Sequence, residues 1–279
     1  MQNRFDLLIA IKSFNFNSIH LFSDDNFLLR FLRTKKYSNI DAFQMMENFL
    51  IAIQTHTEWF ENLTYDDVKL KELYDSGYIF PLPERDENGC RVILIQASKL
   101  DTNKFTCCDI FRIINFVIGI LLEEHETQIS GLVYIIDHKD ITMKYISLFS
   151  LIDVKNYLNC IQNAFPGRQK KLFMVHLPSF AVMIVDFAKS LISKKLKSRV
   201  FAANNTEELQ KNIDQKLLPK EYGGIVTASE MMETFRCTMK QHQHKLQIKS
   251  FIELKSNQLN EQSYKNSGVV GSFRKLEID

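Results

Sequence analysis

Histidines and clustered acids are the side chains that most often carry catalysis or bind metals, and their spacing here favours neither role. His242 and His244 lie two positions apart on a predicted helix and so point to different faces, whereas a metal pair is spaced at i, i+4. His176 ends a predicted strand and can act as an acid or base, but a structural role is the preferred interpretation. The remaining cluster is interpreted as a solvated helix end: Glu123, Glu124 and Glu126.

Phosphate-binding loops and nucleophile motifs are also missing from the sequence. The chain has nine glycines, and no GxGxxG, GxxxxGK(S/T) or GxSxG pattern occurs. The sequence therefore predicts a protein that is not an enzyme and that uses no cofactor and no metal.

Composition narrows the class of protein further. The chain has 279 residues and a net charge of +2. It contains no run of roughly 18 uncharged apolar residues, which a membrane span requires. Its five cysteines lack a CxxC pair, which argues against a zinc site or a disulfide framework. We expect a cytoplasmic protein that binds no nucleic acid, so any basic function must come from local clusters.

Two basic clusters enclose a long apolar stretch. "FPGRQKKLFMVHLPS" (165–179) has three cations in four positions, and "FAVMIVDFAKSLISKKLKSR" (180–199) is apolar over a wide arc before a second basic cluster. Pro178 and Ser179 are suited to stop a strand and to cap a helix over residues 179–197. In such a helix the polar residues share one narrow face: Asp186, Ser190, Ser193 and Lys197.

This predicted helix has two interpretations. It can be an ordinary helix covering an α/β sheet, with its apolar excess against a neighbouring helix. Alternatively, it can be a lid over an apolar cavity that also meets a membrane, because cations beside an amphipathic helix attract anionic lipid.

The elements that position these residues fall into two parts. Residues 1–75 predict a small helical bundle, in which Ser23 is suited to cap the first helix. Apolar residues repeat at helical spacing in this helix and in a second one over residues 40–60. Their inward residues are Phe27, Leu28, Phe31, Leu32, Ala42, Met45, Met46, Phe49, Ile53 and Phe60.

The following residues predict an α/β fold with a mostly parallel sheet. Apolar runs at 91–96, 131–137 and 171–177 hardly alternate, which is typical of strands covered on both faces, and helical patterns at 106–126 and 145–164 separate them. A weaker strand is expected at 199–204. A turn-rich boundary precedes the first strand. The expected domains are a helical module (1–75), a ligand-binding domain (76–226), a helical extension (227–262) and a flexible tail (263–279).

Five motifs in order resemble the CRAL-TRIO family of lipid-transfer proteins, which includes tocopherol transfer-like and retinaldehyde-binding proteins. They are "DDNFLLRFLRTKKYSNIDAF", "DIFRIINFVIGILLEEHETQISGLVYIID", "FPGRQKKLFMVHLPSF", "LLPKEYGG" and, similar to an invertebrate branch, "GVVGSFRKLEID". The resemblance covers nearly the whole chain. Two positions depart from it: His176 replaces the family's asparagine, and Asp140 replaces a glycine.

The resemblance implies an apolar ligand cavity between the sheet and helices, closed by a gate that corresponds to residues 179–192. It implies a cytosolic carrier of a small hydrophobic lipid that associates transiently with phosphoinositide-containing membranes. The expected cavity residues are Phe111, Ile114, Ile118, Tyr134, Ile136, Ile161, Leu172, Met174, Ile184, Ala188 and Leu191. The cations expected to contact phosphoinositide head groups are Lys35, Arg168, Lys170, Lys195 and Arg199.

Other functions remain open from the sequence. The same fold suits a phospholipid exchanger for phosphatidylinositol or phosphatidylcholine, and a lipid-responsive regulator that binds its ligand without transporting it. A small-molecule enzyme is the least favoured, because no nucleophile or cofactor motif supports it.

Overall fold

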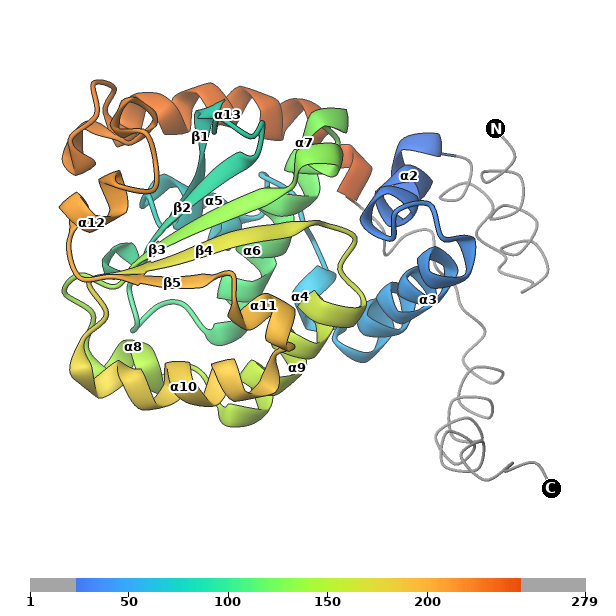
Figure 1. Ribbon diagram of the computed structural model, residues 1–279, viewed down its shortest axis with the longest axis horizontal. Coiled ribbons are helices and arrows are strands. Elements are labelled where there is room, and N and C mark those ends of the chain that lie inside the picture. Colours follow the sequence, from blue (N-terminus) through green and yellow to red (C-terminus); the bar gives the residue numbers. More distant parts are fainter. Residues whose placement is uncertain (1–23, 247–279) are drawn as a thin grey trace.

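The computed structural model describes residues 24–246, which form a five-stranded sheet with helices packed around it (Figure 1). The strand order is β1-β2-β3-β4-β5, in which β1 is antiparallel to β2 and the other neighbours are parallel. This confirms the predicted mostly parallel α/β sheet. The strands are β1 (Ile79–Arg85), β2 (Arg91–Gln96), β3 (Leu132–Asp137), β4 (Gln169–Val175) and β5 (Val200–Ala203).

Several predicted helices are each divided in two. Residues 40–60, 106–126, 145–164 and 179–197 were each expected to form one helix, and each contains a break. The α-helices are α2 (Asp25–Thr34), α3 (Asn39–Thr55), α4 (Thr57–Phe60), α5 (Val68–Asp75), α6 (Cys107–Leu121), α7 (His125–Ser130), α8 (Met143–Ser147), α9 (Leu151–Asn163), α10 (Val182–Leu191), α11 (Lys194–Lys197), α12 (Thr206–Gln210) and α13 (Ala228–His242). Short 3₁₀ turns complete the described chain: η2 (Ala97–Lys99), η3 (Ser179–Ala181), η4 (Gln215–Leu217), η5 (Lys220–Tyr222) and η6 (Gln243–Leu246).

Strand β1 corrects the turn-rich boundary expected before residue 91. Pro81 and Pro83 lie in β1, an edge strand whose only strand neighbour among the described residues is β2. An edge strand tolerates proline, because the missing N–H is not needed by a second neighbour. The register shifts between Pro81 and Arg85.

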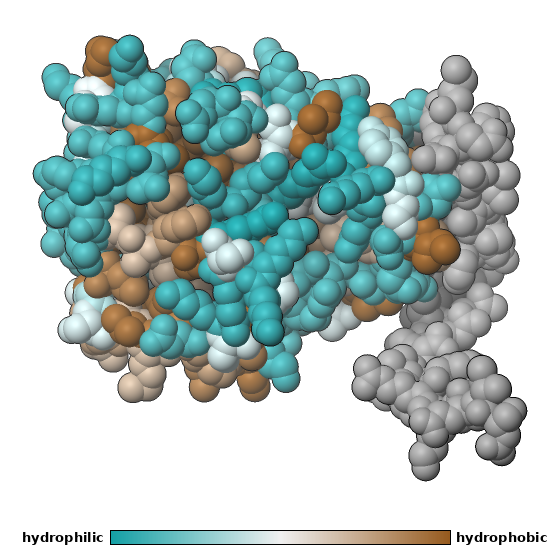
Figure 2. Space-filling model, viewed as in Figure 1, coloured by the Kyte–Doolittle hydropathy of each residue, from teal (hydrophilic) through white to brown (hydrophobic). Residues whose placement is uncertain are grey.

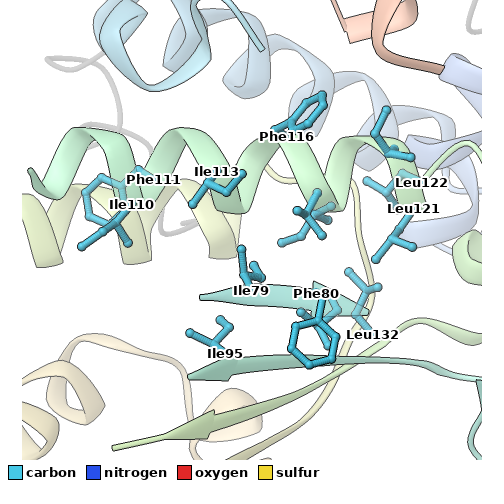
Figure 3. Close-up of a cluster of buried hydrophobic side chains, with 14 of the residues drawn as sticks. Ile79, Phe80, Ile95, Ile110, Phe111, Ile113, Phe116, Leu121, Leu122 and Leu132 are labelled. Atoms are coloured by element: carbon cyan, nitrogen blue, oxygen red, sulfur yellow. The ribbon is translucent and has the colours of Figure 1, made fainter. Parts of the chain in front are cut away.

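Helix α6 forms much of the core. The helix begins with a capping box, in which the side chains of Thr106 and Asp109 each accept a hydrogen bond from the backbone N–H of the other residue. Figure 3 shows Ile113 pointing from α6 toward Ile79 of β1, and both residues are fully buried. The helix therefore lies over the β1 side of the sheet.

The N-terminal helices attach to this body through polar contacts as well as apolar ones. The predicted inward residues of α2, α3 and α4 are all buried. Arg30 forms a buried ion pair with Glu123, and Arg33 Nη1 donates to Gln128 Oε1 at 2.5 Å. A buried pair of this kind stabilises one particular docking geometry, because moving either partner leaves the other charge uncompensated.

Some predictions fall beyond or at the margins of the described residues. Asp24 caps α2, and the predicted cap Ser23 lies outside the described range. The expected tail and the end of the 227–262 extension also lie outside it. Within it, α13 runs along the β1 side of the sheet (Figure 1).

Candidate functional site

An apolar cavity of about 280 Å³ lies between the sheet and helices α6 and α9. It also reaches the turn between α10 and α11 and the start of β5. Its lining is almost entirely apolar and consists of Ile95, Ile114, Ile118, Tyr134, Ile136, Tyr157, Leu158, Ile161, Phe165, Gln169, Lys171, Leu172, Ile192, Leu196, Arg199 and Val200.

The alternation of burial along β3 reflects this cavity. Val133 and Ile135 point to one face and are fully packed, whereas Tyr134 and Ile136 on the other face retain accessible surface. In a central strand that surface can only face an internal space. Leu172 pairs in register with Tyr134 and so continues the same wall on β4.

Six of the eleven predicted cavity residues line this cavity: Ile114, Ile118, Tyr134, Ile136, Ile161 and Leu172. Phe111 instead stacks behind the wall on Tyr157, with ring centroids 3.9 Å apart, and Met174 is buried further along β4. The other three lie on α10, which ends before the cavity: Ile184, Ala188 and Leu191. Contact with a ligand remains a prediction for all eleven.

Several lining residues were not predicted, although the sequence carried a signal for some of them. Ile95 pairs with Ile136 in register, so the face chosen on β3 also selects it on β2. Tyr157 and Leu158 precede Ile161 by four and three positions and therefore share its helix face. Ile192 and Leu196 line the cavity only because the chain turns between α10 and α11, which the sequence pattern does not reveal.

Polar groups are concentrated where β3, β4 and β5 begin. Burial raises the pKa of the Tyr134 hydroxyl, and the neighbouring Gln169 amide acts in the opposite direction. The guanidinium of Arg199 donates to the Gln169 backbone oxygen. Elsewhere in the wall, the Tyr157 hydroxyl lies 3.5 Å from Asn115 Oδ1. The polar atoms of these residues contribute almost none of the surface that faces the cavity.

Helix α10 packs against the body without burying any of its residues. Ser179 does not cap a helix as expected: it begins η3, and neither η3 nor α10 has a side-chain N-cap bond. Met183 is 81% exposed. We define the exposed apolar face as Met143, Leu151, Ile152, Phe180, Val182 and Met183, which belong to α8, the start of α9, η3 and α10. Figure 2 shows apolar surface at the place where α8 and α10 lie in Figure 1.

The turn that ends α10 is held by one side chain of α9. Ile192 has extended backbone angles, so the polar stripe expected along a single 179–197 helix does not exist. Gln162 Nε2 donates to the Leu191 carbonyl oxygen at 3.2 Å, and Gln162 Oε1 accepts from the Ser193 N–H at 2.9 Å. One amide therefore replaces helix hydrogen bonds on both sides of the break.

The five cations predicted to meet head groups occupy different environments. Arg199 lines the cavity, and Arg168 donates to backbone carbonyl oxygens in α2 and α7. Lys35 is half-buried after α2, whereas Lys170 and Lys195 are exposed. Their binding of head groups remains a prediction.

A second polar cluster lies at the carboxyl ends of β2, β3 and β4. The Asp137 carboxylate accepts from the Tyr222 hydroxyl and lies 2.8 Å from His176 Nδ1, and Gln96 Nε2 donates to Tyr222 at 3.2 Å. His176 does not line the cavity. The arrangement ties the η5 turn to the sheet, which supports the structural interpretation of His176.

The two departures from the family pattern both occupy left-handed backbone positions. Asp140 has φ 58° and His176 has φ 52°. Asn, Asp and His are enriched among non-glycine residues with positive φ. The loop geometry that glycine and asparagine favour is therefore retained with different side chains.

The fold and cavity define a mixed α/β protein that encloses an apolar space beside an exposed helix. The family model of the CRAL/TRIO domain matches residues 75–224, more than half of the chain. The chain therefore belongs to the CRAL/TRIO family of lipid-binding and lipid-transfer proteins.

Individual relatives match over most of this chain. Clavesin-1 of Xenopus laevis is 29% identical over 75% of this chain and 63% of its own length, and the alpha-tocopherol transfer protein-like protein of Homo sapiens is 31% identical over 75% and 60%. The chain thus spans about three fifths of these relatives. The crystal structure of Sfh5 aligns with a TM-score of 0.54 over 74% of both chains at 14% identity, which shows the fold alone.

Metal-binding clusters and membrane-spanning helices are both absent from the described residues. Between residues 24 and 246, no group of three or more His, Cys, Asp or Glu side chains could hold a metal ion. Within the same range, no helix is long and apolar enough to cross a membrane.

Replacing His138 with glutamine is expected to flatten the pH dependence of unfolding between about pH 7 and pH 5. Burial lowers the pKa of His138 below its usual 6.5, so the unfolded chain binds more protons and stability falls as pH drops through 6.5 toward the folded pKa. His138 changes the free energy of unfolding by at most about 1.4 kcal/mol per pH unit. Urea unfolding at several pH values across this range measures that free energy. If its slope against pH were the same in the variant and the wild-type protein, the prediction would be contradicted.

Proposed function

We propose that this protein carries a small hydrophobic molecule in its cavity and transfers it at membrane surfaces that contain phosphoinositides. The observation that carries this proposal is an internal apolar cavity next to an apolar helix that buries none of its residues. A catalytic site would need reactive groups in the cavity, whereas its lining is nearly all hydrocarbon. Membership of a lipid-binding family supports the same conclusion.

The cavity can retain such a molecule through the hydrophobic effect alone. Burial of apolar surface contributes about 25 cal/mol per Å², so a ligand that buries roughly 400 Å² gains on the order of 10 kcal/mol. This gain has to exceed the cost of lost translational and rotational freedom, which is about 4 kcal/mol or more. Apolar molecules of this size are therefore retained in water.

Filling the cavity is expected to abolish ligand retention while the fold survives. Ile114 lies on α6 and lines the cavity, so Ile114→Trp places an indole where the ligand would lie. Native mass spectrometry with organic extraction of the freshly purified protein measures the bound molecule. The matched control is Ile129→Trp, because Ile129 is 52% exposed and lies outside the lining. Equal ligand content in both variants would contradict this site.

Release requires the α10 segment to move away from α9. Two hydrogen bonds of Gln162 join α9 to the turn after α10. Opening exchanges these bonds for bonds to water and uncovers Ile192 and Leu196 of the lining. Gln162 therefore stabilises the closed arrangement.

Gln162→Ala is expected to raise the ligand dissociation rate roughly tenfold, because two hydrogen bonds of about 0.5–1.5 kcal/mol each are lost only in the closed form. Stopped-flow transfer of a bound fluorescent lipid to acceptor vesicles measures this rate. Asn159→Ala, one turn earlier on α9, is the control, since Asn159 bonds only to Asn163 among the described residues. If both variants dissociate at the wild-type rate, Gln162 does not hold the gate.

The exposed apolar face supplies the membrane contact in this proposal. Its six side chains can enter the boundary region of a bilayer, while exposed cations such as Lys195 attract anionic head groups. Membrane contact then favours the open form only if the face binds lipid better when α10 moves.

Met183→Asp is expected to weaken binding to phosphoinositide-containing vesicles roughly tenfold, because a buried apolar side chain contributes about 1.5–3 kcal/mol and a carboxylate is repelled by anionic lipid. Vesicle co-sedimentation measures the binding. Ile225→Asp is the control: Ile225 is 78% exposed and lies just before α13, away from the exposed apolar face. Equal losses in both variants would show a general charge effect and not a specific face.

A further inference from the structure

Some residues of the cavity wall carry polar side chains, yet the wall presents hydrocarbon to the cavity. These residues are Tyr134, Tyr157, Gln169, Lys171 and Arg199. Their polar atoms contribute almost none of the surface that faces the cavity. The placement of these atoms therefore decides which ligands the cavity can accept.

Three of these side chains meet their partners within the protein where β4 begins. The Tyr134 hydroxyl is hydrogen-bonded to the side chain of Gln169. Gln169 Nε2 also donates to the Gly167 carbonyl oxygen at 3.3 Å. The Arg199 guanidinium donates to the backbone oxygen of Gln169. The protein itself therefore supplies partners for these groups.

The other two polar side chains are directed elsewhere as well. The Tyr157 hydroxyl lies 3.5 Å from Asn115 Oδ1. Lys171 pairs in register with Val133, which points to the face of β3 opposite the cavity. Because side chains alternate along a strand, the side chain of Lys171 leaves the sheet on that opposite face.

The described wall holds no unpaired buried polar atom that a ligand could complete. Among residues 24–246, no lining residue has a buried side-chain nitrogen or oxygen atom without a hydrogen-bond partner. The helical wall is also stiff, because isoleucine has one strongly preferred χ1 rotamer in a helix, as at Ile114, Ile118 and Ile161. A hydroxyl or carboxylate that enters the cavity loses its bonds to water and gains none, which is unfavourable.

The volume of the cavity indicates how much hydrocarbon it can hold. An apolar cavity of roughly 150 Å³ inside a protein binds benzene. This cavity has about 280 Å³, which is nearly twice that volume. It therefore matches two fused rings or an isoprenoid of about ten carbon atoms.

We propose that the cavity selects uncharged molecules without a hydroxyl or carboxyl group, of which a small isoprenoid hydrocarbon is the simplest case. This inference rests on the proposed function, because it names the class of hydrophobic molecule that the same cavity carries. Selectivity then comes from the cost of desolvating a polar group in a cavity that offers it no partner.

The test compares naphthalene, 2-naphthol and 2-naphthoate, which share one ring system and differ in their polar group. Equilibrium dialysis measures their binding after the bound molecule has been removed with a hydrophobic resin. The wild-type protein is expected to bind naphthalene at least about tenfold more tightly than 2-naphthol, and 2-naphthoate more weakly still.

A pair of variants tests whether the missing partner causes this preference. Ile136 lines the cavity in the centre of the sheet, between Ile95 and Met174. Ile136→Thr and Ile136→Val shorten the side chain equally, but only threonine adds a hydroxyl to the wall. The threonine variant is expected to reduce the preference for naphthalene over 2-naphthol several-fold, whereas the valine variant retains it.

The outcomes separate this inference from the proposed function. If none of the three probes binds the wild-type protein, the apolar-carrier function itself fails. If 2-naphthol or 2-naphthoate binds as tightly as naphthalene, the carrier function stands and the inference is overturned, a result that does not depend on how any variant folds. If the folded threonine and valine variants show the same preference, a missing partner is not its cause and the inference is overturned as well.

Discussion

A cavity of about 280 Å³ has to persist in a protein interior that is otherwise close-packed, and much of the surrounding structure can be understood from this constraint. Side chains that line such a space lack the packing contacts that they would make in a filled core. The walls must therefore resist collapse. The parallel pairing of β2, β3 and β4 supplies one rigid wall, and the stack of Phe111 on Tyr157, with Trp59 at its edge, supports another.

The N-terminal helices contribute to the same rigidity where β4 begins. Arg168 joins carbonyl oxygens of α2 and α7, and Gln169 follows it directly as the first residue of β4. Gln169 in turn accepts from Arg199. The buried pair of Arg30 and Glu123 fixes the position of α2 in this chain of contacts. Docking of the helical module is thus connected through hydrogen bonds to Gln169 and Arg199, which line the cavity.

The sequence specified the parts of this architecture that depend on local pattern. The run at 91–96 coincides with β2. The resemblance to the family led to the choice of Tyr134, Ile136 and Leu172 on β3 and β4; these residues line the cavity and Met174 does not, and their contact with a ligand remains a prediction. Prediction from the sequence was wrong where contacts with distant residues determine the local structure. The prolines of β1 are accepted because that strand lies at an edge, and the break at Ile192 carries no proline or glycine signal because a distant residue, Gln162, stabilises it. The placement of Arg199 in the lining follows from that break.

Helix α10 is less deeply buried than the strands of the sheet. Strands β2 to β4 cannot separate without breaking ladders of hydrogen bonds and exposing fully buried residues, whereas α10 buries none of its residues and has no side-chain cap. Two bonds from Gln162 stabilise the turn after α10 by about 1–3 kcal/mol, if each is worth about 0.5–1.5 kcal/mol. Each 1.4 kcal/mol of differential affinity shifts a two-state equilibrium about tenfold, so a membrane needs to favour the open form by only a similar amount. In the proposed function, this difference between the rigid strands and α10 is what lets the cavity retain a ligand in water and release it at a membrane.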